Sequence, residues 1–514
     1  MLLNYNRYIR LFNTIKFLRP QQIFYRIYYV CRDFWESKAQ KEKVLIKPSS
    51  SFPLELQKSI HIADTYFGDK KFNFLNLSYT FNQIDWNFAE YGKLWTYNLN
   101  YFDYLSQDSC KDGLMLIESF IANSEIIRDG MEPFPISLRG MNWIKFLSQQ
   151  KIKNQQVDDS LYAQYDTLLK KIEYHLLGNH LLENAFSLLF GAYYFHDELM
   201  YEKSRKILVE ELEEQILDDG GHFELSPMYH QIMLFRVLDL INLVKNNDWK
   251  DHELLSLLSS KAEIMLGWLV NMSYSNGDIP LFNDSANGIA PTSKQLLEYA
   301  QRLGVASRSL KLSGSGYRKV SKKNYECFVD IGKIGPDYIP GHAHADTFNF
   351  ELRIDNRPFI VDSGLSTYEV SPRRDIERAT SSHNTVEVGG KNQSDVWGGF
   401  RVGNRASVIS LNESDNCIEA THDGYAKENI YHTRKWSFEE RQILIEDRLS
   451  KHANAISRLH FHPDVTRKEI DQHIKIEGNW VIKNYYFADA FNQTKEALMI
   501  ESDFNQTSKI IISM

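Results

Sequence analysis

Two histidines and an aspartate are grouped in the segment Gly341-His-Ala-His-Ala-Asp346, just before a run with the pattern of a β-strand. That run, 347–354, alternates polar and apolar residues, as a strand with one buried face does. At this two-residue period, His342, His344 and Asp346 share the side that carries the apolar residues. Titratable groups that enter a buried face are costly unless they find partners or a metal ion. The segment is the first candidate for chemistry, although satisfied core residues would also fit, and the motif alone names no reaction.

A second polar group lies at the head of an apolar helical pattern, in the segment Gly178-Asn-His-Leu-Leu-Glu-Asn184. At helical spacing, His180 shares one face with Glu183 and Asn184. A carboxylate beside an imidazole can fix its tautomer and raise its basicity. Ordinary helix capping by Asn179, with Glu183 in the first turn, explains the same residues without catalysis.

A tyrosine falls in the first turn of another expected helix. Ser226-Pro227 is a good helix start, with serine as the N-cap and proline at the first helical position. Tyr229 then lies where the helix dipole would stabilise a phenolate. A single tyrosine at such a place is otherwise a surface or core residue.

Composition narrows the class of protein. The chain has 514 residues and a net charge of −8, which argues against a general nucleic-acid binder. An acidic polymer remains compatible as a ligand, because a local cationic groove can exist on an acidic protein. The four cysteines are widely separated and form no CxxC pair, so the sequence shows no zinc finger and no redox motif.

The hydrophobic period changes once along the chain. Helical spacing predicts helices over 160–177, 180–196, 202–217, 227–246, 252–272 and 293–303. Beyond a boundary near 305–320 the pattern consists of short alternating runs broken by turn residues, typical of antiparallel strands. Such runs are 348–354, 406–411, 417–421, 442–445, 455–461, 474–476 and 481–486. A helical domain therefore precedes a β domain.

The N-terminal segment is basic and aromatic. Arg10, Lys16, Arg19 and Arg26 are scattered among tyrosine, phenylalanine, leucine and isoleucine. No continuous apolar region is present, so the segment resembles neither a signal peptide nor a spanning helix. It is either an amphipathic helix packed on the protein or an interfacial helix that contacts a membrane peripherally. We expect a cytoplasmic location or one at the cytoplasmic membrane, with the periplasm as the alternative.

Taken in order, these motifs resemble the heparinase II/III-type polysaccharide lyases and the alginate lyases of the same architecture. The resemblance runs from about Trp95 to about Asp447 and implies a multidomain α+β fold, an incomplete (α/α) toroid followed by an antiparallel β-sandwich, with the cleft between them. The expected domains are an N-terminal helical extension (1–90), the toroid (91–312) and the β-sandwich (313–514). The motifs that carry the resemblance are 179–184, 226–230, 341–346, Val361-Asp-Ser-Gly364 and Ser382-His-Asn-Thr385.

The resemblance also implies roles for individual residues. His180 and Tyr229 match catalytic positions on the toroid, and His342 matches one on the β domain. Asn179 and Glu183 match cleft positions around them, with Asn179 as a donor that takes part in catalysis.

A structural zinc site is implied in the same way. His344, Asp362 and His383 match positions that bind zinc in some members of the family. Two imidazoles and a carboxylate suit Zn²⁺, with water or another side chain as the fourth ligand.

Lyase chemistry accounts for these residue types. The C5 proton of a uronate is weakly acidic, so its removal requires neutralisation of the C6 carboxylate, for which Asn179 and a histidine are suitable donors. A base then takes the C5 proton and an acid protonates the leaving O4, and Tyr229 could do either or both. Side chains expected to bind the acidic polysaccharide or oligosaccharide are Glu183, Arg139, Trp143, Arg378 and Arg401.

Three functions therefore remain open. The first is a lyase that cleaves an acidic, uronate-containing glycan by β-elimination, in the metabolism of bacterial surface or capsular polysaccharide. The second is a hydrolase or transferase of surface-polymer assembly, for which Glu224 and Asp284 are the candidate carboxylate pair. The third is a glycan-binding protein without catalysis, which would tolerate loss of Tyr229 or His342.

Overall fold

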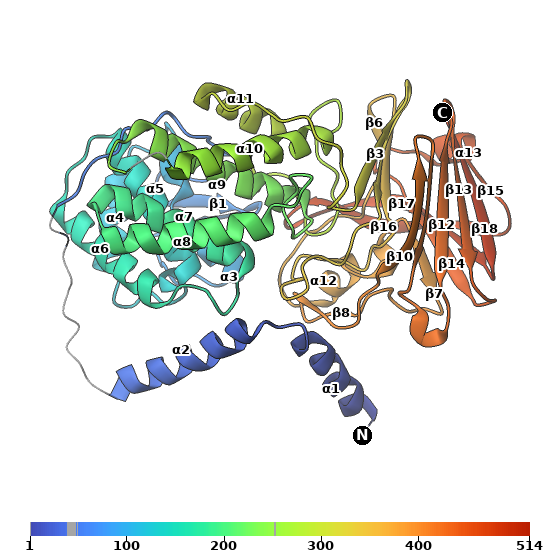
Figure 1. Cartoon of the computed structure of the whole chain (residues 1–514), viewed down its shortest axis with the longest axis horizontal. Helices are drawn as coiled ribbons and strands as arrows, with labels where there is room; N and C mark the ends of the chain where they lie inside the picture. Colours follow the sequence, from blue (N-terminus) through green and yellow to red (C-terminus); the bar gives the residue numbers. More distant parts are fainter. Residues whose placement is uncertain (1, 39–47, 49, 251–252) are drawn as a thin grey trace.

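The chain forms a helical domain and a β domain that lie side by side, with two N-terminal helices along one edge (Figure 1). The computed structural model describes residues 2–38, 48, 50–250 and 253–514. None of the helices in these ranges is both long and apolar enough to cross a membrane.

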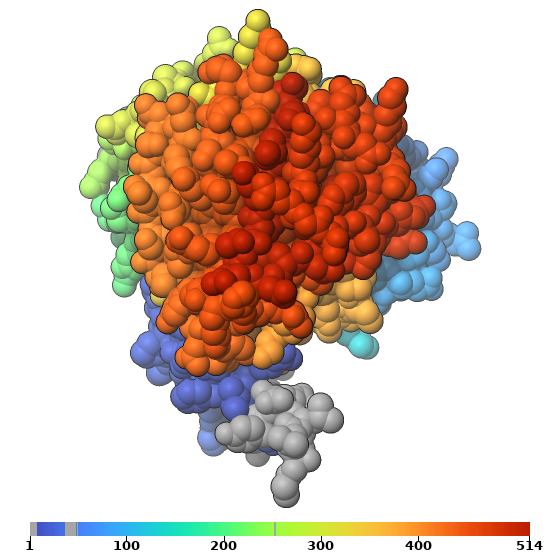
Figure 2. Space-filling view, turned by 90° about the vertical axis from the view of Figure 1, so that its right-hand side faces the viewer, coloured from blue at the N-terminus to red at the C-terminus, as the bar shows by residue number. Residues whose placement is uncertain are grey.

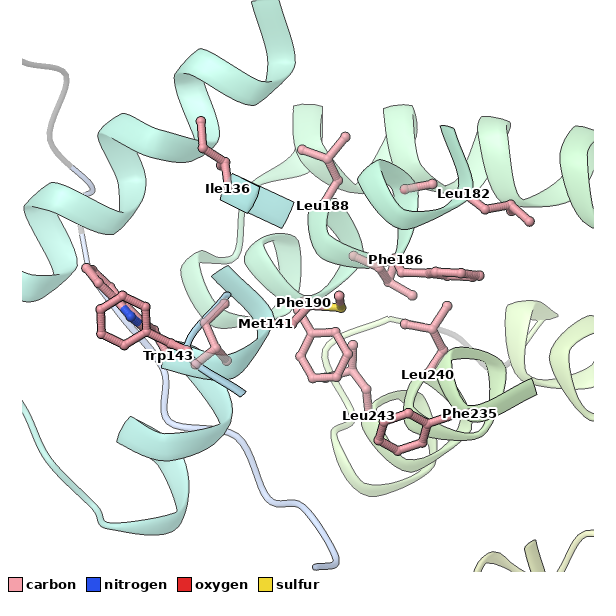
Figure 3. Close-up of a cluster of buried hydrophobic side chains, with 14 of the residues drawn as sticks. Ile136, Met141, Trp143, Leu182, Phe186, Leu188, Phe190, Phe235, Leu240 and Leu243 are labelled. Atoms are coloured by element: carbon pink, nitrogen blue, oxygen red, sulfur yellow. The ribbon is translucent and has the colours of Figure 1, made fainter. Parts of the chain in front are cut away.

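The helical domain is built from inner helices buried on nearly every side and outer helices with one exposed face. α7 (Gly178–Phe195) and α9 (Pro227–Asn246) are buried around nearly their whole circumference, as inner helices must be, and the few polar side chains on them are buried as well. α5, α7 and α9 interlock through large side chains, including Phe186, Phe190 and Phe235 (Figure 3). The helices are α3 (Lys93–Tyr101), α4 (Gly113–Ala122), α5 (Pro133–Gln149), α6 (Gln155–Lys170), α7 (Gly178–Phe195), α8 (Glu198–Gln215), α9 (Pro227–Asn246), α10 (Glu253–Asn271) and α11 (Ser293–Leu303), with 3-10 turns at Asp103–Ser106 and Asp129–Met131.

Most of the helices expected from the sequence are confirmed, and one differs in its bounds. The expected helix 160–177 begins earlier and ends at Lys170. The segment 171–177 is instead a loop, which turns the chain into α7 through the positive φ angles of Leu177 and Gly178. This loop carries Glu173 to the head of α7, where it contacts candidate site residues.

The expected N-terminal extension is helical only in its first part. α1 (Leu2–Ile15) and α2 (Pro20–Lys38) are helices, but the β1–β2 hairpin (Lys71–Phe74, Leu77–Thr80) follows them. Phe72, Phe74 and Trp86 belong to the core of the toroid. The stretch before α3 is therefore part of the toroid domain and not of a separate extension, because its aromatic side chains complete that core.

The β domain is an antiparallel sandwich, as the alternating runs predicted. Its sheets have the strand orders β10-β11-β12-β13-β18-β15, β16-β17-β14-β7 and β3-β4-β5-β6, and an isolated bridge between Ile360 and Phe461 links the last two. Side chains from all three sheets share one apolar core. The strands are β3 (Tyr317–Ser321), β4 (Tyr325–Asp330), β5 (Phe350–Ile354), β6 (Arg357–Ile360), β7 (Val386–Val388), β8 (Val396–Trp397), β9 (Arg401–Val402), β10 (Val408–Ser414), β11 (Cys417–His422), β12 (His432–Phe438), β13 (Gln442–Leu449), β14 (Ala455–His460), β15 (Ile474–Ile476), β16 (Trp480–Ala490), β17 (Gln493–Phe504) and β18 (Thr507–Ser513), with short helices α12 (Pro372–Glu377) and α13 (Arg467–His473) and 3-10 turns at Thr380–Ser382 and Ala426–Glu428.

The segment Gly341–Asp346 is a loop that faces the toroid and not the first part of a strand. β5 begins only at Phe350, after Phe348 takes a positive φ angle. The apolar side chains of the run are buried as expected, but so are the polar ones between them, so the strand has no exposed face. In a strand, His342 and His344 would share one face. In this loop they contact the two carboxylate oxygens of Asp284, on the toroid side.

Candidate active site

Residues from both domains meet where the heads of α7 and α9 face the β domain. The ring centroids of Tyr229 and His342 are 3.9 Å apart, although 113 residues separate them in the sequence. Tyr229 and His342, expected to act together from the two domains, are therefore in contact. A reacting sugar could therefore touch groups from both domains at once.

The start of α9 is fixed by hydrogen bonds that also reach the neighbouring turn. Ser226 Oγ accepts from the Tyr229 backbone N–H at 3.2 Å, which confirms the N-cap read from the sequence. The same hydroxyl donates to the Asp284 carbonyl oxygen at 2.8 Å. The helix that carries Tyr229 and the turn that carries Asp284 are thus tied together.

Asp284 is the centre of the polar network. Its carboxylate accepts from His342 Nδ1 at 2.9 Å and from His344 Nε2 at 2.8 Å. Arg374 makes a bidentate pair with it at 2.5 and 2.7 Å. Burial alone would raise the pKa of Asp284, but Arg374 and the two imidazoles hold it well below its usual range. An ionised Asp284 therefore holds His342 in place and fixes the proton on its Nδ1.

Glu224 lies on the other side of His342 and holds Asn179. The Asn179 side-chain amide donates to both oxygens of Glu224, at 3.0 and 2.9 Å. Glu224 Oε2 is 3.5 Å from His342 Nε2. Asn179, expected to act on substrate, is thus engaged with a carboxylate next to the catalytic candidates.

His180 is the more accessible polar group of α7. Its Nδ1 lies 3.1 Å from Glu173 Oε1, and the other oxygen of Glu173 accepts from Asn184 at 2.9 Å. Burial disfavours the charged ring, but Glu173 outweighs it and raises the pKa of His180. One third of the His180 side chain stays exposed, so an imidazole whose charged form Glu173 favours faces an incoming anion.

The hydroxyl of Tyr229 carries its proton at neutral pH. Burial raises the pKa of Tyr229, and the Tyr368 hydroxyl donates to the Tyr229 oxygen at 3.3 Å. A protonated phenol can act as a general acid without first taking up a proton.

Three further candidates lie close together in the β domain, as expected. His383 Nδ1 donates to Asp362 Oδ2 at 2.8 Å, and the His344 and His383 ring centroids are 5.3 Å apart. Among the described residues, no three potential ligand side chains meet at metal-binding distance. Nevertheless His344 Nδ1 and His383 Nε2 are buried without a hydrogen-bond partner. In each ring the second nitrogen donates to a carboxylate, so the unpartnered nitrogen keeps its lone pair. These two imidazole nitrogens are donors of the type that Zn²⁺ takes.

Glu183 lies below the cleft surface. It is almost fully buried and accepts from Arg236 Nε at 3.0 and 3.1 Å. Arg236 lines a cavity of about 710 Å³ inside the toroid, together with Asn98 and Asn142. Glu183 therefore reaches any ligand only through Arg236.

The two arginines of the β domain have different surroundings. Arg378 is fully buried and donates to the carbonyl oxygens of Ala343 and Gly399, so it braces the loop that carries His342. It is not free to bind substrate, which corrects the expectation from the sequence. Arg401 is exposed and packs over Trp397, where it remains available to an anionic ligand.

Arg139 and Trp143 lie in the core of the toroid, contrary to the expectation that they line the cleft. Both side chains are fully buried on α5, and Trp143 packs among apolar residues (Figure 3). Arg139 donates to Gln164 at 2.7 Å and to the carbonyl oxygens of Asn100 and Gly130. A buried polar group with satisfied partners is a structural element, which sequence position alone did not reveal.

Arg139→Met should therefore lower stability and spare function. The substitution leaves three buried acceptors unpaired, at roughly 1–3 kcal/mol for each such group, so the loss is about 3 kcal/mol or more. Denaturant unfolding measures that loss, while ligand affinity and turnover of the folded protein should change less than twofold. Retained stability with lost ligand binding would return Arg139 to the cleft.

Sequence reasoning missed the residues that organise the site. The sequence predicts Asp284 and Glu224 only as the carboxylate pair of a hydrolase. Glu173 and Tyr368 carried no signal, because their importance comes from contacts made across loops.

A helical toroid joined to an antiparallel sandwich, with histidines and a tyrosine at the junction, defines the architecture of toroid-type polysaccharide lyases. The Heparinase II/III N-terminus family model matches residues 141–305, and the Heparinase II/III-like, C-terminal model matches residues 305–503. The chain belongs to the heparinase II/III-like family.

Curated relatives and solved structures agree with this membership. A heparin-sulfate lyase of Bacteroides stercoris is 27% identical over an alignment of 250 residues, gaps included, that covers 43% of this chain and 37% of the relative. A heparin-sulfate lyase of Pedobacter heparinus is 25% identical over an alignment of 322 residues, gaps included, that covers 56% of this chain and 46% of the relative. The aligned parts thus span less than half the length of each of these two relatives.

Two solved structures show the same fold. A heparinase III crystal structure has a TM-score of 0.63 and 16% identity and covers 98% of this chain and 92% of its own. The heparan sulfate lyase of Pedobacter heparinus has a TM-score of 0.53 and 15% identity, with 86% and 81% covered. At these identities the likeness supports the toroid and sandwich alone.

Proposed function

We propose that this protein is a polysaccharide lyase that cleaves an acidic, uronate-containing glycan by β-elimination. The observation that carries the proposal is the contact between Tyr229 of the toroid and His342 of the β domain, 3.9 Å between ring centroids. Membership of the heparinase II/III-like family and the heparin-sulfate lyases among its relatives support it. A role in surface or capsular polysaccharide metabolism is part of the same proposal.

The geometry suggests how the reaction would be divided among the residues. His180, in the protonated form that Glu173 favours, neutralises the C6 carboxylate and so acidifies the C5 proton. Because Asp284 accepts the Nδ1 proton of His342, the lone pair of Nε2 is left to take the C5 proton. The C4–O4 bond breaks as the C4–C5 double bond forms, and Tyr229 gives its proton to O4.

The two carboxylates that could serve a hydrolase are committed elsewhere. Asp284 is held by Arg374 and two imidazoles, and Glu224 is held by Asn179, each without side-chain exposure. A hydrolase needs one carboxyl group on each side of an accessible bond. The lyase proposal is therefore preferred to hydrolysis.

Product analysis with a panel of uronate polymers tests the reaction type. Elimination creates an unsaturated, ultraviolet-absorbing sugar end with each cleavage. New reducing ends without that absorbance would establish hydrolysis, and binding without any product would establish a glycan-binding protein.

We also propose that His344, Asp362 and His383 hold a structural Zn²⁺. Burial lowers the pKa of His344 to about 4, so its ring is neutral at pH 7, the form that binds metals. The unpartnered nitrogens of the two histidines would be ligands, and Asp362 already orients His383. The metal would stabilise the β domain without taking part in the elimination.

Replacing a ligand should cost both metal and stability. We expect His344→Ala and His383→Ala to lose stoichiometric zinc by elemental analysis, and a chelator to lower the thermal midpoint of the wild type but not of either variant. His432→Ala is the matched control, because it removes a buried histidine bound to Asp447 at 2.7 Å. Purified wild type without metal would remove the proposal.

The N-terminal segment is a candidate for peripheral contact with a membrane. Its two helices carry exposed apolar side chains and basic residues, which favour such a contact.

A further inference from the structure

The two N-terminal helices turn apolar side chains outward. On α2, Ile23, Ile27, Val30 and Phe34 follow one another at helical spacing, and all are exposed. Phe24, Tyr28 and Trp35 widen this stripe, and the Val30 and Trp35 side chains are 72% and 69% exposed. A helix packed on a protein normally buries such a face, whereas here the apolar stripe lies outside.

α1 repeats the arrangement. Tyr8, Leu11, Phe12 and Ile15 lie at helical spacing and are exposed, Phe12 by 69%. Both helices lie along the same edge of the molecule, below the toroid and the β domain (Figure 1), and the N-terminal segment protrudes from that edge in the view onto the β domain (Figure 2).

The opposite face of each helix is fixed to the body, so the outward direction of the apolar stripes is determined. Gln22 of α2 is buried and donates to the carbonyl oxygens of Leu176 and Tyr338, at 3.1 and 3.4 Å. Arg19 pairs with Glu214 of α8 and stacks 3.9 Å over the Tyr338 ring.

α1 is attached to the β domain in the same manner. Arg10 pairs with Asp395 at 2.9 Å, and Trp397 Nε1 donates to Thr14. Phe17, in the link between the helices, lies under Arg405 at 3.8 Å. Contacts to both domains therefore hold the pair of helices in one orientation.

The exposed stripes form a surface larger than isolated surface residues do. Twelve large apolar side chains of residues 8–35 are at least 38% exposed. Six of them are aromatic, and at about 150–250 Å² each with about half of it exposed, these six alone present on the order of 600 Å². The six aliphatic side chains add to this area. The largest patch on an ordinary monomer is roughly 300–600 Å². This patch needs an occupant.

The charge of the segment identifies the occupant. Residues 8–35 contain five basic residues and one acidic residue, in a chain whose net charge is −8. The Arg10 and Arg19 side chains stay 52% and 42% exposed despite their ion pairs. Basic residues beside exposed phenylalanine, tyrosine and tryptophan are the composition of helices that lie in the interface of an anionic bilayer. The rest of the acidic protein would be repelled by such a surface, which restricts contact to this edge.

We propose that α1 and α2 together form a docking surface for an anionic lipid bilayer. The helices would lie in the plane of the interface with their apolar stripes among the acyl chains and their basic residues at the headgroups. The proposal does not depend on the reaction that the active site performs.

Docking would also bear on the catalytic loops. The two carbonyl acceptors of Gln22 belong to the loops that lead into Asn179 and into His342. α2 thus contacts one loop of each domain that leads toward the candidate site.

Sedimentation of the full chain with lipid vesicles tests the proposal. We expect binding to vesicles of phosphatidylcholine with roughly one third phosphatidylglycerol, and at least tenfold weaker binding to phosphatidylcholine alone, because each basic residue near an anionic surface contributes about 1 kcal/mol. Phe24→Ser/Ile27→Ser/Val30→Ser and, separately, Lys16→Glu/Arg26→Glu should each weaken binding to the anionic vesicles at least tenfold. Val481→Ser/Tyr486→Ser is the matched control, since these exposed apolar residues lie on β16.

Fluorescence quenching tests whether the contact with lipid is made by the exposed stripe of α2. Brominated lipid should quench the part of the tryptophan fluorescence that Trp35→Phe removes, because Trp35 lies on the exposed stripe. Circular dichroism and the thermal midpoint check that the variants fold, which we expect because only exposed atoms change.

Several outcomes would overturn the proposal. Wild-type protein that stays in solution with anionic vesicles would do so, as would a triple variant that binds as well as the wild type. A dimer in solution that the same triple variant dissociates, without any vesicle binding, would assign the surface to a second copy of the chain.

Discussion

Replacing Tyr229 by phenylalanine should lower turnover by about 10²-fold or more while the protein stays folded. The substitution removes one hydroxyl and keeps the ring that stacks on His342. General acid–base catalysis by a positioned side chain contributes roughly 10²–10⁴-fold. Ligand affinity should hardly change, because the lost proton transfer acts in the transition state. Steady-state kinetics on the substrate found by the polymer panel, together with a binding isotherm, measure both.

Stability separates this result from simple damage. The Tyr229 hydroxyl has one side-chain partner, Tyr368 at 3.3 Å, so its loss should cost about 1 kcal/mol. Tyr368→Phe is the matched control, since it breaks the same hydrogen bond but leaves the proton on Tyr229. If the two variants lost turnover equally, the hydrogen bond and not the acid would be responsible. Near-full turnover in Tyr229→Phe would remove most of the lyase mechanism.

Much of the architecture follows from the sequence because periodicity reports burial directly. α9 and α11 have the bounds that helical spacing predicted, and each predicted alternating run overlaps a strand of the sandwich. Other strands, including β4, β12, β17 and β18, were not among the predicted runs. Burial of one face is a local property of a helix or strand, and the pattern of apolar residues records it. The N-cap at Ser226 was readable for the same reason, since its partner is three residues away.

The site was readable only in part, because its organisation depends on contacts between distant segments. His342 and Tyr229 were found by motif. The role of Asp284 as the common partner of His342, His344 and Arg374 was missed. Its three partners lie 58–90 residues away in the sequence. No periodic pattern encodes such a meeting.

The errors over Arg139 and Trp143 have a related cause. Arginine and tryptophan near a motif are typical of glycan clefts, but a sequence does not show which way a helix faces when most of its residues are buried. α5 is buried around most of its circumference, so polar and aromatic residues fall inside as well as outside. Arg139 is tolerated there because Gln164 and two backbone carbonyls satisfy it.

Asp284→Asn should be the most damaging single substitution at the site. An amide of the same shape leaves Arg374 buried without its counter-charge, and breaking such a pair costs roughly 3–5 kcal/mol. The thermal midpoint should fall by on the order of 10 °C. Turnover of the folded fraction should fall at least 10²-fold, since the proton on His342 Nδ1 is no longer fixed by a carboxylate.

The pH dependence of the stability difference identifies the charge as the cause. The pKa of Asp284 is held well below its usual range in the folded protein. The charged carboxylate therefore makes its full contribution to the free energy of unfolding at any pH above the pKa of an unfolded aspartate, about 3.9. The gap between the wild type and Asp284→Asn should therefore be constant from pH 7 to about pH 5 and narrow as the pH falls further, because protonation of Asp284 removes the same charge. Thermal midpoints of both proteins across this range measure the gap.

An exposed ion pair gives the control for this last prediction. Asp278 pairs with Arg353 at 2.6 Å but is more than half exposed, so Asp278→Asn should cost at most about 1 kcal/mol. Equal losses in the two variants would contradict the central role of Asp284, because burial is what makes its charge expensive to remove. A stable Asp284→Asn protein without turnover would show that Asp284 serves only to position His342. An unstable protein with full turnover per folded molecule would show that Asp284 serves only to stabilise the fold.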